Sequence, residues 1–429
     1  MKGEHGASTL LNLGDYGGTL AALRLMARRG VSVHLAEYRR WVPSRHSRFL
    51  SRTLSCPPPS DWTAFMQWLF AYGEAHPGTF LYPTSDDMAW LYAQYADRLR
   101  PHFLLWQPSA RVIYTLLNKK LLSQVCDQLS IAVPRTYFPT SREEIEEGSR
   151  QLKAPYLLKP LTQIGLKIGH KGRIVTAKDD PHSAYEAFKD QLVYQPELLA
   201  YDETVAWPMM QEYYAGAMQS IVSIAGFVAA DGSIVARSSR KVLQRPRRLG
   251  IGLCFESIPL DAALVKDLER LCRHVGYYGI FEAEFIEEAA GGQGRRLLID
   301  FNPRYYGQMG FEIARGLPLP YLALLAARGS GAELARELEA ARLIPSDRLA
   351  TYSTTWLLRL SLFAGWISRK HSGAELLRWR RWRFDPRHHY TDAVYDAQDP
   401  RPYFIDMLVN GARYLRHPRD FIRKFFLDT

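Results

Sequence analysis

The chain has 429 residues, of which 47% are apolar and 23% are charged. These proportions are typical of globular proteins and exclude a wholly disordered, fibrous or coiled-coil chain, and the length allows two or three domains. The most apolar stretches, 317–327 and 356–367, are interrupted by Pro318, Pro320 and Arg359, so neither predicts a membrane-spanning helix.

The N-terminal residues lack the apolar core of a signal peptide. The four cysteines lie far apart without a CxxC pair, which favours reduced thiols over disulfides or a zinc site. We therefore expect a cytoplasmic protein.

The net charge is +11, from 55 Lys and Arg against 44 Asp and Glu. Such an excess suits nucleic acid, an anionic membrane surface or small polyanions such as nucleotides. Residues 335–429 hold 17 of the basic and 11 of the acidic residues. The sequence has no RNA-binding, zinc-finger or helix–turn–helix signature, which disfavours nucleic acid.

The first hundred residues predict an alternating α/β domain. An apolar strand over 8–13, a turn with Gly14, Gly17 and Gly18, a helix over 19–29 and a strand over 31–36 begin a doubly wound parallel sheet. The glycine spacing is not GxGxxG, so a structural role suits the turn as well as nucleotide binding. After the strand 79–83, the polar residues 84–87 either face a ligand or cap a helix over 88–98.

A second unit begins after Pro108, with helices predicted over 118–129 and 261–275. Strands are predicted over 156–159, 173–176, 209–213, 220–228, 234–237, 280–286 and 296–301. Asp231–Gly232 is a turn signal, and Gly291, Gly292 and Gly294 join the last two strands. Beyond about Gly331 the composition shifts toward Arg, Trp and His, which indicates an appended module.

Three pieces of this second unit carry chemistry. Lys119 and Lys159 lie in separate elements, and Lys159 precedes a glycine-bearing loop, 161–172, so both suit a polyphosphate. Glu282 and Glu284 are two residues apart on one strand and face the same side. The pieces also have ordinary explanations, such as a solvated glutamate face.

The third piece is the end of the next strand, where Asp300 and Asn302 share a face and Arg304 follows. Oxygen ligands from adjacent antiparallel strands can hold Mg²⁺, and a nearby arginine would neutralise phosphate charge. An Asn-Pro turn is the ordinary explanation here.

The order of these pieces resembles the ATP-grasp superfamily over roughly residues 111–329. The matching stretches are NKKLLSQVCDQLSIAVPRT, YLLKPL, MMQEYYAGAMQS, GIFEAEFI and LLIDFNPRYYGQ. The resemblance implies that Lys119 and Lys159 contact the α- and β-phosphates and that Glu212, Tyr213 and Tyr214 form the hinge that holds adenine. Gln219 takes the place of the family's ribose-binding carboxylate.

The resemblance also implies metal and catalytic residues. Glu284, Asp300 and Asn302 would bind two Mg²⁺ ions, with Mn²⁺ as the alternative, while Arg304 contacts phosphate. It places the basic residues around Ser239–Lys241, Arg240 among them, near the γ-phosphate or a carboxylate substrate. DFNPR replaces the commoner ExNxR, and the loop after Lys159 has fewer glycines than usual, which leaves Lys171 as a second phosphate contact or an exposed loop lysine.

We therefore predict an α/β and α+β protein of three parts. These are an N-terminal Rossmann-like pre-ATP-grasp domain (1–110), a two-lobed ATP-grasp domain (111–330) and a basic, mostly helical C-terminal module (331–429). The implied function is an ATP-dependent ligase that joins a small-molecule carboxylate to an amine through an acylphosphate and releases ADP and phosphate. The amino-acid and peptide ligase branch fits best, including D-aspartate-ligase-like proteins, whose GD-x-GG turn resembles 14–18.

Two alternatives to this function stay open. One is other ATP-grasp chemistry, either carboxylation or thioester formation. The other is a non-catalytic nucleotide-binding scaffold, which the intact set of metal-binding residue types disfavours.

The tail offers its own alternatives. Residues 356–383 contain Trp356, Trp366, Trp379 and Trp382 with seven Lys or Arg and one acid, Glu375. A helical module packed on the core or on a second copy in a homodimer is favoured. The others are a peripheral membrane contact, a bulky anionic substrate or nucleic acid.

Overall fold

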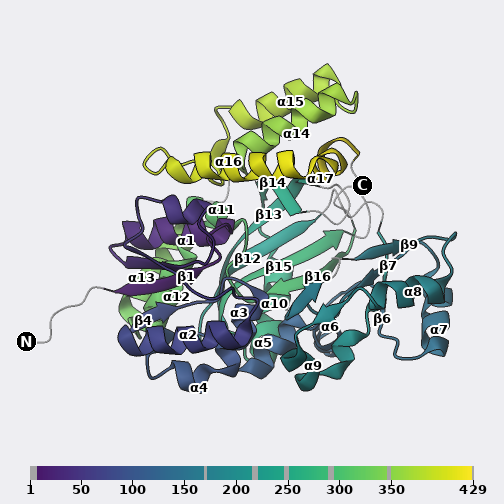
Figure 1. Cartoon of the computed structure of the whole chain (residues 1–429), viewed down its shortest axis with the longest axis horizontal. Coiled ribbons are helices and arrows are strands. Elements are labelled where there is room, and N and C mark those ends of the chain that lie inside the picture. Colours follow the sequence, from purple (N-terminus) through teal and green to yellow (C-terminus); the bar gives the residue numbers. More distant parts are fainter. Residues whose placement is uncertain are drawn as a thin grey trace, which may run out of the picture.

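The computed structural model describes residues 7–168, 172–214, 221–245, 251–287, 294–344 and 349–427. Three regions lie side by side in Figure 1, with a seven-stranded sheet between the N-terminal sheet and a smaller sheet, and a layer of C-terminal helices lies across one end. The mixed α/β class predicted from the sequence is confirmed.

The N-terminal sheet is wholly parallel, in the order β3-β2-β1-β4-β5. Its strands are β1 Ser8–Asn12, β2 Ser32–Ala36, β3 Arg52–Leu54, β4 Thr79–Leu81 and β5 Phe103–Leu105. The connecting helices are α1 Gly17–Arg28, α2 Trp62–Ala75, α3 Asp86–Gln94 and α4 Ala96–Leu99, and α5 Ala110–Leu117 follows. The predicted parallel sheet is thus present.

The glycines at the start of α1 allow close packing. A Cβ atom on Gly17 would lie 2.7 Å from the carbonyl oxygen of Gly307, and one on Gly18 would lie 2.5 Å from that of Tyr306. The first helix therefore rests directly on the backbone that follows Arg304. This contact gives the glycine turn the structural role that its spacing allowed.

The seven-stranded sheet has the order β16-β15-β12-β13-β14-β17-β18 and is antiparallel except between β17 and β18. Its strands are β12 Val222–Val228, β13 Ile234–Arg245, β14 Ile251–Ile258, β15 Gly279–Glu287, β16 Arg296–Asn302, β17 Ala350–Ser353 and β18 His389–Asp392. Gly232 has φ +79°, as the predicted turn between β12 and β13 requires. Two of the strands come from beyond residue 330, so the C-terminal segment completes this sheet.

The smaller antiparallel sheet has the order β6-β11-β7-β9. Its strands are β6 Thr136–Tyr137, β7 Tyr156–Lys159, β9 Arg173–Val175 and β11 Met209–Glu212, and β8 Leu166–Ile168 pairs separately with β10 Val193–Tyr194. Helices α7 Arg142–Leu152 and α8 Pro181–Lys189 pack on it through Ile145, Leu152, Tyr185 and Phe188. The other helices before the C-terminal layer are α6 Lys119–Gln128, α9 Pro196–Tyr201, α10 Ala262–Val275, α11 Met309–Ala314, α12 Leu319–Ala327 and α13 Gly331–Leu343.

The C-terminal layer consists of α14 Thr355–Ile367, α15 Gly373–Phe384, α16 Arg401–Arg416, α17 Pro418–Ile422 and a π-helical turn, Arg423–Leu427 (Figure 1). Trp379 and Trp382 pack against Val242, Leu243 and Cys254 of the seven-stranded sheet. The packing interpretation of the tail holds for these two tryptophans, whereas Trp366 is 56% exposed. Within the described residues no helix combines the length and apolar character needed to cross a membrane.

Candidate active site

The pairs Glu282–Glu284 and Asp300–Asn302, predicted on neighbouring strands, lie opposite each other. In the antiparallel register of β15 and β16, Glu284 faces Asp300 and Glu282 faces Asn302. The two-residue period of a strand brings the four side chains to one face of the sheet. The predicted juxtaposition is confirmed, and it concentrates oxygen atoms at one edge of the sheet.

Two lysines from other elements close on these carboxylates. Lys119 Nζ lies 2.8 Å from Asp300 Oδ1, and Lys241 Nζ lies 3.0 Å from Glu284 Oε1. Lys119 is the first residue of α6, whose N-cap is the Asn118 side chain. Its backbone N–H also donates to the carbonyl of Leu161, which anchors the helix start to the loop after β7.

Lys159 is the third lysine of the site. It ends β7, and its Nζ donates to Gln211 Oε1 at 3.3 Å, across the strand pair β7–β11. Burial and then repulsion from Lys119 lower the pKa of Lys159 to about 8. An anion bound beside Lys159 would therefore stabilise the charged form of this lysine.

The ion pairs also shift the pKa values of their partners. Burial alone would raise the pKa of Asp300, but Lys119 and Lys159 more than offset it, so this pKa lies below its ordinary value. Burial would lower the pKa of Lys119 and of Lys241, yet their carboxylate partners hold both above the ordinary value. Asp300 is thus ionised, and Lys119 and Lys241 are charged, at neutral pH.

Glu282 has a different environment. It is buried, and its carboxylate accepts from Ser223 Oγ at 2.9 Å, from Asn302 Nδ2 at 3.3 Å and from Gln308 Nε2. Burial and then repulsion from Glu284 raise its pKa. These bonds use the oxygens of Glu282 to hold its neighbours, which agrees with the supporting role predicted for it.

Arg304 connects the strand end to the N-terminal sheet. Its guanidinium donates to Asp86, to Tyr16 Oη at 3.2 Å and to Asn302 Oδ1 at 2.9 Å. Ser85 caps α3 and Asp86 stands in its first turn, so the segment 84–87 serves both as a helix cap and as a partner for this arginine. An open pocket lies here, lined by Leu13, Tyr16, Thr84, Ser85, Asp86, Asp87, Gln163 and Arg304.

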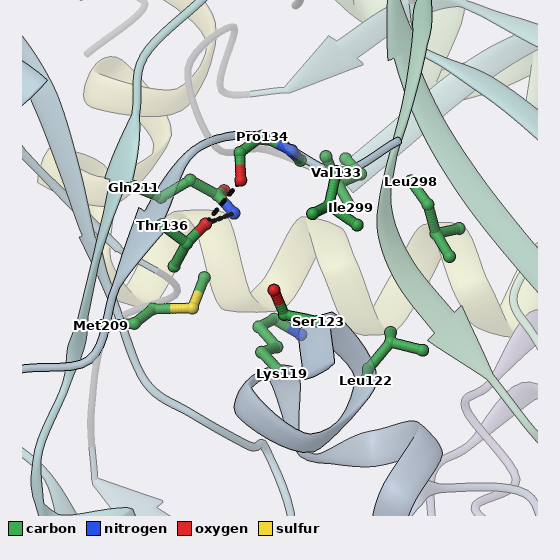
Figure 2. Close-up of a pocket in the computed structure, with 10 residues that line it drawn as sticks. All are labelled: Lys119, Leu122, Ser123, Val133, Pro134, Thr136, Met209, Gln211, Leu298 and Ile299. Carbon is green, nitrogen blue, oxygen red and sulfur yellow. Dashed lines mark hydrogen bonds between the residues drawn. The ribbon is translucent and has the colours of Figure 1, made fainter. Parts of the chain in front are cut away.

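A second, small pocket opens beside Lys119 between the two antiparallel sheets. Figure 2 shows its lining, with α6 on one side, Leu298 and Ile299 of β16 on another, and Met209 and Gln211 of β11 facing them. Gln211 Nε2 donates to Thr136 Oγ1 at 3.2 Å, and Thr136 Oγ1 donates to the Pro134 carbonyl at 2.9 Å (Figure 2). The lining is mostly apolar, with a lysine at one end, which suits a flat ring that carries a charged tail.

The donor set at the β15–β16 edge suits a hard cation. Glu284 and Asp300 provide carboxylate oxygens opposite each other, and Asn302 provides an amide oxygen. Mg²⁺ is usually held by one or two carboxylates and keeps waters and substrate phosphates as its other ligands. Among the described residues no group of three or more His, Cys, Asp or Glu side chains is arranged to hold a metal ion by itself.

The remaining predicted residues are placed as follows. Glu212 ends β11, its N–H donates to the Arg135 carbonyl, and its side chain accepts from Tyr214 Oη at 2.9 Å; Tyr213 stands between them. Gln219 and Lys171 lie outside the described residues.

The structure does not bring Arg240 into the cluster. Its Nε donates to Glu256 at 3.1 Å, and Glu256 also accepts from Trp382 of the C-terminal layer. Lys241, the next residue, points to the opposite face and reaches Glu284. The sequence prediction named Arg240 instead of Lys241, because strand alternation does not tell which of two adjacent residues faces the site.

Comparisons with known proteins give a fold and no close relative. No protein-family model matches the sequence, and a search of curated proteins found no match. Among solved structures, a biotin carboxylase βγ-ATP complex from Campylobacter jejuni is similar, with 16% identity and a TM-score of 0.59 over 75% of this chain and 71% of that one. An L-amino acid ligase from Bacillus licheniformis has 14% identity and a TM-score of 0.54, covering 76% of this chain and 75% of that chain.

A third similar structure is an N5-carboxyaminoimidazole synthetase from Staphylococcus aureus complexed with ADP. It has 12% identity and a TM-score of 0.57, covering 76% of this chain and 79% of that chain. The three proteins share the ATP-grasp fold, and this chain has that fold. The family resemblance predicted from the order of the sequence motifs is confirmed at the level of fold.

Proposed function

We propose that the protein is an ATP-dependent ligase that joins a carboxylate to an amine and releases ADP and phosphate. The observation that carries this proposal is the convergence of Lys119 and Lys241 on Asp300 and Glu284 beside the pocket of Figure 2. The similar structures give further support, since one is a βγ-ATP complex, one holds ADP and one is an L-amino acid ligase.

The residues divide the work of holding the nucleotide. The apolar pocket takes the adenine ring, the hinge residues 212–214 that follow Gln211 of its lining hold the ring edge, and Lys119 and Lys159 bind the phosphates. Glu284, Asp300 and Asn302 would hold Mg²⁺, which neutralises the charge of the β- and γ-phosphates when bound. Catalysis then depends on positioning and on charge that is already in place.

The acceptor side lies at Arg304. This guanidinium is fixed by Asp86, Tyr16 and Asn302, so it can face developing phosphate charge without reorganising. The pocket between Arg304 and α3 is where we place the carboxylate substrate, which attacks the γ-phosphate to form an acylphosphate. An amine then displaces the phosphate group and forms an amide bond. Lys241 takes the charge-stabilising role that the sequence assigns to Arg240.

The same proposal extends to organisation. We place the N-terminal domain at 1–110, the ATP-grasp domain at 111–330 and the C-terminal module at 331–429, with β17 and β18 of the module completing the ATP-grasp sheet. Small molecules in the cytoplasm are the expected substrates.

The test is a screen with the full chain and Mg-ATP. Amino acids, other carboxylates and bicarbonate are supplied with and without amines, and phosphate release is measured together with the adenine nucleotide formed. We expect calorimetry to detect ATP binding. We also expect ADP and phosphate to form only when a carboxylate and an amine are both present. Release of AMP and pyrophosphate, or no ATP binding, would contradict the proposal. Turnover with bicarbonate alone would assign the protein to carboxylation.

A further inference from the structure

Large apolar side chains are concentrated on the outside of the C-terminal layer. Between residues 363 and 422 the exposed ones are Phe363, Trp366, Ile367, Leu377, Phe384, Tyr395, Phe404, Met407, Leu408, Leu415 and Ile422. Leu408 is 67% exposed and Leu415 is 85% exposed. Scattered exposed apolar residues are normal, but a cluster on one layer marks an interaction surface.

On α14 the exposed residues form one stripe. Phe363, Trp366 and Ile367 follow each other at helical spacing, with Arg359 one turn before and Lys370 just after them. The rings of Phe363 and Trp366 are 6.4 Å apart. The other face of α14, with Leu358, Ser361 and Ala364, is buried against the protein. The helix α14 therefore has one face buried against the protein and a second, apolar face exposed to solvent.

The neighbouring helices repeat the pattern. On α15, Leu377, Arg381 and Phe384 share an exposed face, while Trp379 is buried. On α16, Phe404, Leu408 and Leu415 form another stripe. The C-terminal end of α14 also packs against the π-helical turn, where Lys370 Nζ donates to the Phe426 carbonyl at 2.6 Å.

The charge of this layer is predominantly positive. Residues 355–427 contain 14 Lys and Arg against seven Asp and Glu. Six of the acids accept hydrogen bonds or ion pairs from within the chain: Glu375, Asp385, Asp392, Asp396, Asp399 and Asp406. The exposed cations include Arg378, Arg380, Arg381, Arg413, Arg416, Arg419 and Arg423. Positive charge thus surrounds the apolar stripes.

We propose that the outer face of α14–α17 docks on an anionic lipid bilayer. Apolar side chains at the headgroup boundary and cations beside anionic headgroups are the two attractions that hold amphipathic helices on a membrane. A second copy of the chain would bring an equally basic surface against this one, which opposes self-association. The stripes mix aromatic with aliphatic side chains, and the aliphatic ones, Ile367, Leu377, Leu408 and Leu415, offer nothing to a nucleic acid backbone.

The test uses the full chain and flotation with lipid vesicles. Vesicles of neutral phosphatidylcholine are compared with vesicles that contain about 30% anionic phosphatidylglycerol. We expect at least about tenfold stronger binding to the anionic vesicles, and weaker binding as salt rises toward about 0.5 M. ATP binding is measured on the same samples, so a failure here is distinguishable from a failure of the proposed function.

Two variants of the layer separate the two attractions. Phe363→Ser with Trp366→Ser and Ile367→Ser should lower vesicle binding at least tenfold. Arg378→Glu with Arg381→Glu should lower it by about 25-fold or more, at roughly fivefold for each cation lost. The control for the apolar variant is the triple substitution Ile168→Ser, Val193→Ser and Leu260→Ser. The control for the charge-reversal variant is the double substitution Lys178→Glu and Lys266→Glu. These residues are exposed outside the layer, so the controls should bind vesicles as the unmodified chain does.

Circular dichroism and thermal unfolding establish that each variant is folded. The proposal is overturned if the unmodified chain does not bind anionic vesicles at low salt, or if the controls lose as much binding as the layer variants. It is also overturned if the chain binds no vesicles and sedimentation shows a dimer that the α14 variant dissociates. Binding of duplex RNA without vesicle binding would overturn it in favour of nucleic acid.

Discussion

The protein has two cation-rich regions, and they differ in how the charge is satisfied. At the β15–β16 edge, Lys119 and Lys241 are largely buried and each holds a carboxylate. On the C-terminal layer the arginines are exposed among apolar side chains. Burying an unpaired charge is costly, so the first region must supply its own counter-ions, whereas water solvates the second. The first is built for a small polyanion and the second for a broad anionic surface.

Strand β13 separates the two regions. Arg240 lies on the face covered by the C-terminal layer, where Glu256 also accepts from Trp382. Lys241 lies on the other face, toward Glu284. Two adjacent basic residues therefore belong to different regions, and the following predictions test how independent these regions are.

The largest effect is expected at the contact between the C-terminal segment and the N-terminal sheet. Asp399 is 1% exposed and accepts from Arg24 Nε at 3.0 Å, from Ser47 Oγ and from the Arg48 N–H. Asp399→Ala leaves the buried Arg24 guanidinium without its carboxylate, so the free energy of unfolding should fall by about 3–5 kcal/mol. Denaturant unfolding followed by tryptophan fluorescence measures it.

Asp396→Ala is the matched control for this prediction. Asp396 pairs with Arg28, and each lies a few residues from the corresponding member of the Arg24–Asp399 pair. Because both side chains are partly exposed, the loss in the free energy of unfolding should not exceed about 1 kcal/mol. A loss of about 1 kcal/mol or less in both variants would show that the contact of Asp399 with the N-terminal sheet contributes little to stability.

Asp300→Asn should have the next largest effect, on catalysis. The substitution removes the anionic oxygen that holds Lys119 and that would bind Mg²⁺, so kcat/KM should fall by on the order of 10²–10³. The assay is phosphate release with the substrate pair found in the screen. Asp97→Asn on α4, whose side chain is fully exposed, serves as the control. Near-normal phosphate release by Asp300→Asn would show that the active site does not lie at the β15–β16 edge.

Much of this site could be predicted from the sequence because its signals are local. Strand periodicity alone puts Glu282 with Glu284, and Asp300 with Asn302. The pairing of Glu284 with Asp300 also depends on an irregular register just after Glu284, which periodicity does not give. The parallel N-terminal sheet is equally local, since alternating strands and helices define it.

Other parts depend on contacts between distant residues. The bond between Arg304 and Asp86 joins residues 218 positions apart. The strands β17 and β18 join the sheet from beyond residue 330, after α13 and after α15 respectively. The sequence around β14 does not indicate a strand, so the sequence leaves open the face of the sheet on which Arg240 lies. Irregular register between β13 and β14 just after Lys241 adds to that difficulty.

A smaller effect is expected from pH. Because burial and Lys119 lower the pKa of Lys159 to about 8, this ammonium loses its proton as the pH rises through that value. ATP favours the charged form, so its Kd should increase about tenfold from about pH 7 to about pH 9. Calorimetry with a non-hydrolysable ATP analogue measures this. Lys159→Arg keeps its charge and should flatten the profile. A flat profile in the unmodified chain would exclude Lys159 as a phosphate ligand.

The smallest effect should come from Arg240, and it tests the boundary between the two regions most directly. Arg240→Ala removes an exposed ion pair with Glu256 on the face covered by α15, so kcat/KM should change by less than about twofold. Lys241→Met keeps the length of the side chain but removes the ammonium from Glu284, and a bond of this charged kind is worth roughly tenfold or more. Phosphate release and ATP affinity are measured for both variants, with thermal unfolding as the check on the fold. If Arg240→Ala loses more activity than Lys241→Met, the face of β13 that the C-terminal layer covers takes part in catalysis. The two regions are then not independent.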